Sequence, residues 1–112
     1  MSTQVGKQAE NTATDYLIEL GFEVLSRNWR TPACEIDIVC KKDQIVYFVE
    51  VKYRSSNNQG TGLEYITPKK LKQMQFAAEC WVQDQKWSGD YRLSAVSISH
   101  RFMVDAFIED IE

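Results

Sequence analysis

The sequence has few of the side chains from which many common catalytic and metal sites are built. It contains one histidine, His100, and three cysteines, Cys34, Cys40 and Cys80, none of them in a Cys-x-x-Cys pair. An odd cysteine count without such pairs argues against a disulfide framework and a zinc site, and favours a reducing cytosol. A lone histidine without a matching serine or cysteine arrangement does not indicate a nucleophilic triad. No glycine-rich phosphate loop is present, so nucleoside-triphosphate chemistry is not indicated.

Long hydrophobic runs are also missing. No apolar stretch approaches the roughly 18 residues that a membrane span requires. The first residues lack the basic patch and apolar stretch of a secretory signal, so we expect a cytoplasmic protein. With 112 residues, of which 44% are hydrophobic and 26% charged, the chain has a globular composition and the length of one domain, 1–112.

The net charge of −3 argues weakly against a nucleic-acid partner, but the charges are unevenly distributed. Residues 41–72 contain seven basic and three acidic side chains, whereas the last ten residues contain four acids and no basic residue. This distribution can give one positive face, or it can be an ordinary solvated surface.

Periodicity predicts the order of the elements. Helical spacing of apolar residues predicts a helix over 5–20 that Gly21 ends, and Thr67-Pro68 is a typical start for a second helix running to about Gln85. Five strands are predicted, over 22–29, 34–40, 45–53, 92–99 and 102–108. Turn-forming residues predict a mobile loop over 55–62. The order α-β-β-β-α-β-β predicts an α/β or α+β sandwich, in which helices flank a mixed sheet.

Four ionisable residues lie within the strands of the central hairpin: Glu35, Asp37, Glu50 and Lys52. If residues 41–44 form its loop, Glu35 opposes Glu50 and Asp37 opposes Phe48. Because side chains alternate between faces, the four ionisable groups then share one face. The other face, which includes Cys34, Ile36, Ile38 and Cys40, is almost wholly apolar. The sheet should therefore be covered on both sides, with the acids in a partly shielded cleft.

Three carboxylates and one lysine leave a negative excess on that face. Like charges directly opposite one another destabilise a sheet by roughly 0.2–1 kcal/mol. A bound divalent cation would offset this cost, because clustered carboxylates with water molecules suit Mg²⁺. The alternative is an exposed acidic edge with one Lys–Glu pair, and the hairpin by itself leaves both open.

Asp37 followed by Glu50-Val51-Lys52 resembles the catalytic signature of the PD-(D/E)xK nucleases. More of the chain, roughly residues 5–98, resembles the small bacterial YraN-type proteins. The similar positions are Gly6, Glu10, Ala13, Tyr16-Leu17, Gly21, Arg27-Asn28, Glu35-Ile36-Asp37, 48–52, Arg54, Lys70 and Ala77-Ala78. That family is predicted to be endonuclease-like and is similar in layout to archaeal Holliday-junction resolvases. The chain departs from it at Ala9 and Cys34, where glycine is usual, and at Ser94, where aspartate is usual.

The resemblance implies a restriction-endonuclease-like fold and a site for Mg²⁺ or Mn²⁺. It assigns Asp37, Glu50 and the carbonyl of Val51 to the metal, and Lys52 to the attacking water or to the charge developing on the phosphate. Glu10 would complete the site through a water, although the helix dipole alone also favours an acid in an early turn. Glu35 would support the metal ligands or pair with a lysine or arginine. The residues expected to contact backbone phosphates are Arg54, Lys69 and Lys70.

Two functions are therefore expected. One is metal-dependent hydrolysis of phosphodiester bonds in DNA, with branched or processed structures as candidate substrates. The other is a catalytically silent nuclease-fold module that binds nucleic acid or a protein partner. Because a net acidic monomer would hold DNA weakly, we also expect a homodimer with a wider basic surface.

Overall fold

The computed structural model describes residues 3–55 and 66–111, so most of the predicted loop over 55–62 lies outside the described residues. Its elements are α1 (Gln4–Glu19), β1 (Glu23–Thr31), β2 (Cys34–Lys42), β3 (Ile45–Tyr53), α2 (Pro68–Gln85), β4 (Asp90–Ile98) and β5 (Val104–Ile108). The predicted order and the mixed α+β class are confirmed. Thr67 caps α2 as predicted, because its hydroxyl accepts a 3.1 Å hydrogen bond from the N–H of Lys70. Neither described helix combines the length and the apolar character needed to span a membrane.

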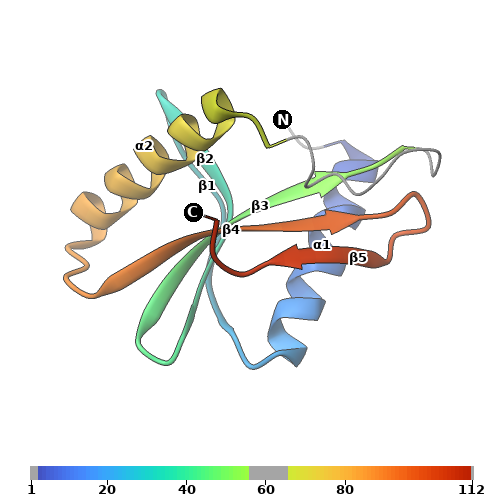
Figure 1. Ribbon diagram of the computed structural model, residues 1–112, viewed down its shortest axis with the longest axis horizontal. Coiled ribbons are helices and arrows are strands. Elements are labelled where there is room, and N and C mark those ends of the chain that lie inside the picture. The colour runs from blue at the N-terminus through green and yellow to red at the C-terminus, as the bar shows by residue number, and fades with distance from the viewer. Residues whose placement is uncertain (1–2, 56–65, 112) are drawn as a thin grey trace.

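The five strands form one sheet in the order β1-β2-β3-β4-β5. Only β3 and β4 run parallel, because α2 crosses between them, and the other neighbours are antiparallel. Figure 1 shows α1 on one face of this sheet and α2 on the other.

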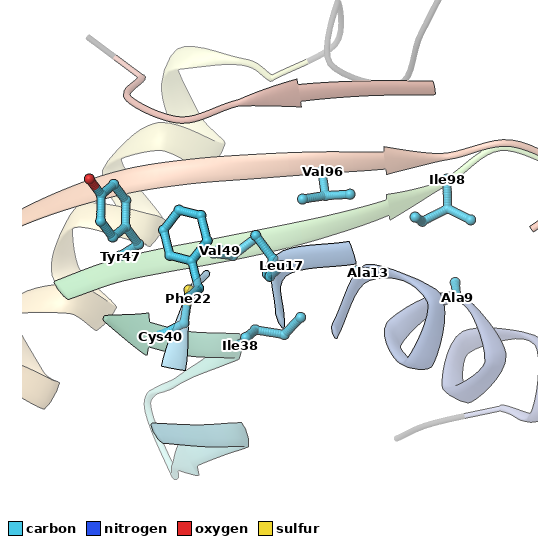
Figure 2. Close-up of a cluster of buried hydrophobic side chains, with 10 residues drawn as sticks. All are labelled: Ala9, Ala13, Leu17, Phe22, Ile38, Cys40, Tyr47, Val49, Val96 and Ile98. Carbon is cyan, nitrogen blue, oxygen red and sulfur yellow. The ribbon is translucent and has the colours of Figure 1, made fainter. Parts of the chain in front are cut away.

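Each helix closes its own hydrophobic core against the sheet. Under α1, Ala13 and Leu17 pack with strand residues such as Ile38, Val49 and Val96 (Figure 2). Under α2, the buried residues include Val39, Val46, Phe48, Ala78 and Trp81. The expectation of a sheet covered on both sides is thus confirmed.

The predicted register of the central hairpin is wrong. Its turn has two residues rather than four: Asp43 and Gln44 both adopt positive φ, 52° and 67°, as a type I′ turn requires. Phe48 therefore pairs with Val39 instead of Asp37. Because the two strands slide by an even number of residues, this shift by itself changes the partner of each side chain but not its face.

The hairpin and its neighbour become irregular at the level of Asp37. In β1, Asn28 lies between the paired residues Arg27 and Trp29 with a left-handed φ of 53°. On the other side, the pairing of β2 with β3 ends at Ile38 and Val49. In this region the side chains of β2 stop alternating regularly between the two faces of the sheet.

One predicted face of β2 is therefore divided. Ile36 packs in the core under α2, together with Cys34, whereas Ile38 and Cys40 pack in the core under α1. The prediction that these four side chains share one face is wrong, since strict alternation does not hold across an irregular pair.

Candidate metal and nucleic-acid site

Asp37 lies where β2 and β3 separate. The backbone N–H of Val51 donates a 2.8 Å hydrogen bond to Oδ2 of Asp37, which joins the strands beyond their last backbone pair. Burial and the nearby charge of Glu50 raise the pKa of Asp37 from 3.8 to about 7, with smaller contributions from Glu10 and Glu35. The hydrogen bond from Val51 opposes this increase in the pKa. Asp37 is thus a shielded carboxyl group surrounded by other acids.

Glu50 approaches Asp37 from β3 and contacts the first turn of α2. Its Oε2 atom lies 3.2 Å from Nζ of Lys70, and its side chain is 22% exposed. Lys70 was expected to contact a phosphate, and the structure adds an ion pair with a predicted metal ligand. The ammonium of Lys70 thus partly neutralises the acid cluster.

Glu10 is held in place from β1. Nδ2 of Asn28 donates a 2.8 Å hydrogen bond to Oε1 of Glu10, and the guanidinium of Arg27 lies 3.5 Å from the same oxygen. Glu10 is only 9% exposed, so it is not the solvated early-turn acid that was the alternative. Its carboxylate contributes to the field at Asp37.

Two cavities meet at these carboxylates. One, of about 160 Å³, lies between the start of α1 and strands β1 and β2, and its lining includes Glu10, Asn28 and Asp37. The other, of about 510 Å³, lies beside α2, and its lining includes Glu50 and Lys70. Glu35 lines both. Glu35 is therefore the acid at which the two cavities adjoin.

The site is not a preformed cage. Within residues 3–55 and 66–111, no three His, Cys, Asp or Glu side chains are arranged to hold a metal by themselves. A cation here would take Asp37 and Glu50 and complete its coordination with a backbone carbonyl, water and a substrate phosphate. Mg²⁺ commonly binds in this way, with only one or two protein carboxylates.

The other predicted site residues have varied surroundings. Lys52 is exposed, lies on the same face of β3 as Glu50, and has no ion pair among the described residues. Lys69 is exposed and lines the larger cavity. The guanidinium of Arg54 is ion-paired with Asp105 of β5 and is 16% exposed.

Glu35 is paired with Arg30 across β1 and β2, at 3.5 Å. This matches one of its two expected roles, that of a partner for an arginine. The other role and the metal and phosphate assignments stay predictions.

Sequence reasoning missed Asn28 and Arg27 as the residues that hold Glu10. Asparagine tolerates left-handed backbone conformations better than most residues, but its position within a predicted strand gave no reason to expect one. The pair Arg27-Asn28 was noted only as part of the family resemblance. Neither spacing nor composition indicated that these residues contact α1.

Comparison with known proteins confirms the family resemblance over most of the chain. Residues 9–104 match the model of the uncharacterised protein family UPF0102. A UPF0102 protein from Chloroherpeton thalassium is 42% identical over 101 residues, which cover 88% of this chain and 78% of the relative. One from Sulfurihydrogenibium sp. is 38% identical over 97 residues, covering 86% and 84%. One from Shewanella oneidensis is 35% identical over 106 residues, covering 92% and 98%.

Proposed function

This chain belongs to the uncharacterised protein family UPF0102, and we propose that it is a metal-dependent endonuclease that hydrolyses phosphodiester bonds in DNA. The observation that carries the proposal is the position of Asp37, a half-buried carboxyl group beside Glu50 with a pKa raised to about 7. Buried acids whose pKa values are shifted by neighbouring acids are concentrated at functional sites. A purely structural role would more often pair such a group with a cation.

The donor atoms in this region suit Mg²⁺ or Mn²⁺. Asp37 and Glu50 supply carboxylate oxygens, which hard divalent cations prefer. The N–H of Val51 points to Asp37, and the N–H and C=O of one strand residue face the same neighbouring strand. The carbonyl of Val51 therefore faces β2 and would be the third protein ligand. When bound, the cation would polarise the phosphate and lower the pKa of the attacking water.

The surrounding side chains would position the nucleic acid and balance its charge. Lys70 can exchange its contact with Glu50 for a phosphate oxygen, since the first turn of α2 also provides backbone N–H groups for an anion. Lys52, on the same face of β3 as Glu50, would stabilise negative charge that develops on the reacting phosphate. Lys69 adds a further positive charge at the rim. This basic surface offsets the net negative charge of the chain locally.

Cleavage of labelled DNA tests the proposal. Junction, flap and single-stranded substrates would be incubated with Mg²⁺, Mn²⁺ or EDTA and the wild-type, Asp37→Asn and Lys52→Ala proteins. Asp84→Asn is a matched control, because Asp84 is exposed on α2 and, within the described residues, its side chain bonds only to the neighbouring Gln85. We expect metal-dependent cleavage by wild type and Asp84→Asn, and a loss of at least about 100-fold in Asp37→Asn. Cleavage that all variants share equally would refute the proposal.

The alternative, a silent binding module, predicts a different pattern. DNA would bind to wild type and depend on Lys69 and Lys70, but no metal would support cleavage of any substrate. The ion pair between Lys70 and Glu50 is the observation that favours this alternative, because it already neutralises one predicted ligand. The same cleavage experiment, combined with a binding measurement in EDTA, separates the two functions.

A further inference from the structure

The outer face of α2 carries a stripe of four residues that line the larger cavity: Lys69, Lys72, Gln73 and Phe76. Their spacing of three, four and seven residues places them on one side of the helix. The opposite side of the helix is buried, with Met74, Ala77 and Ala78 in the core. Figure 1 shows α2 beside β2. The stripe begins in the turn of α2 whose Lys70 is ion-paired with Glu50.

Phe76 is an unusual member of this stripe. Its side chain is 50% exposed, whereas Trp81 on the same helix is 5% exposed and packs edge-on against Phe48. No aromatic or cation–π contact of Phe76 occurs within the described part of the chain. Its ring is therefore available to a planar ligand.

The neighbours of Phe76 determine what kind of ligand fits. Lys69 and Lys72 form no ion pair among the described residues, so both ammonium groups can bind an anion. Lys69 lies about 10 Å from Phe76 along the helix axis, at 1.5 Å per residue, and Lys72 lies between them. A flat apolar ring beside two free cations is complementary to a nucleotide, which combines a base with a phosphate. A hydrophobic protein surface would instead require a wider apolar patch than one phenylalanine.

We propose that Phe76 is a stacking platform for an unpaired base, and that Lys69 and Lys72 hold the adjoining phosphates. Bases within a duplex stack on each other and cannot place a face on this ring. The DNA that reaches the site along α2 is therefore single-stranded, as in a flap, a gap or an opened junction. This inference rests on the proposed function in one respect, because it takes the DNA strand to lead along α2 to Asp37 and Glu50. Base stacking itself needs no metal and no cleavage.

Binding measured in EDTA tests the inference without hydrolysis. The probes are a fluorescein-labelled DNA oligonucleotide and the same sequence as a blunt duplex, with 2-aminopurine in the single strand to report stacking. The variants are Phe76→Ala, Phe76→Trp and Lys72→Gln. Ile18→Ala is the control, because Ile18 is 53% exposed on α1 and lines none of the cavities described above.

We expect Phe76→Ala to weaken single-strand binding by at least about fivefold and to relieve the quenching of 2-aminopurine. Duplex binding should change less than about twofold. Phe76→Trp should preserve single-strand affinity and quenching, and Ile18→Ala should behave like wild type. Lys72→Gln should weaken both forms of DNA and reduce the dependence of log Kd on log salt by about one.

Equal losses of single-strand and duplex affinity in Phe76→Ala would overturn the inference, as would unchanged single-strand affinity or no DNA binding by the wild-type protein. An unchanged salt dependence in Lys72→Gln would overturn the phosphate contact. These results are distinguishable from failure of the nuclease proposal, because that proposal fails on metal-dependent cleavage and on Asp37→Asn. A nuclease that cleaves but shows no role for Phe76 would retain the first proposal and lose the second.

Discussion

The backbone N–H of Val51 donates a 2.8 Å hydrogen bond to Oδ2 of Asp37. This bond connects β3 to β2 just beyond the last pair of their ladder, Ile38 with Val49. If the β2–β3 ladder had continued, a backbone carbonyl of β2 would have accepted a hydrogen bond from this N–H in place of the carboxyl group. The separation of the strands thus places a carboxyl group where backbone hydrogen bonds end, beside Glu50.

The raised pKa of Asp37 predicts how the metal-free protein responds to pH. The folded state binds the Asp37 proton more tightly than the unfolded chain, since the pKa rises from 3.8 to about 7. Its stabilising contribution is complete below the unfolded value and is lost as the pH rises through the folded value. In EDTA, the free energy of unfolding of wild type should therefore fall between pH 5 and pH 8 by on the order of 2 kcal/mol through this group.

Asp37→Asn provides the comparison, because asparagine keeps an acceptor for Val51 but cannot ionise. Urea unfolding at both pH values should show a smaller decrease for this variant than for wild type. An identical pH dependence of the two proteins would mean that Asp37 titrates in the folded protein as it does in the unfolded chain.

Removal of Lys70 should strengthen divalent-cation binding. Its ammonium lies 3.2 Å from Glu50 and would compete with a cation for that carboxylate. Because both side chains are partly exposed, we expect only about a two- to fivefold increase in Mn²⁺ affinity for Lys70→Gln. Calorimetric titration at fixed ionic strength measures it. Lys69→Gln removes the same charge without touching Glu50, and an equal effect of both variants would indicate a general field instead of a local contact.

Asn28 should be replaceable at lower cost by glycine than by alanine. Its φ of 53° is left-handed, which is costly for a residue with a Cβ atom and free for glycine. Both variants lose the hydrogen bond to Glu10. In guanidinium unfolding, Asn28→Ala should be less stable than Asn28→Gly by about 1 kcal/mol. The reverse order would contradict the left-handed conformation at this position.

Gln44→Gly should stabilise the protein. Both residues of the hairpin turn have positive φ, and glycine is preferred at such a position in a type I′ turn. The free energy of unfolding should rise by about 0.5–1 kcal/mol. Thermal and urea unfolding would measure this change. A loss of stability would instead favour the four-residue loop that the sequence indicated.

The order of elements was predictable from the sequence, because apolar periodicity and the Thr67-Pro68 cap are local signals. The faces of Glu50 and Lys52 were also predictable, since the error in register was an even number of residues. The register itself was not, because Asp43-Gln44 lacks the glycine that usually marks a two-residue turn.

The site depends on features that periodicity cannot indicate. The left-handed conformation of Asn28 and the end of the β2–β3 ladder both interrupt the alternation of side chains on which the prediction relied. The contact of Lys70 with Glu50 depends on the packing of α2 over the sheet, which is a tertiary relationship. Glu10 is brought to the site by α1 in the same way. Here the family resemblance, and not the spacing, singled out Glu10 as a candidate for this site.

The most direct test of the metal site is the anomalous scattering of a crystal of this protein grown with Mn²⁺. The account predicts one strong peak within coordination distance of the carboxylates of Asp37 and Glu50 and of the carbonyl of Val51, and its loss in Asp37→Asn. No peak at these atoms, or peaks only at exposed acids elsewhere on the surface, would contradict it.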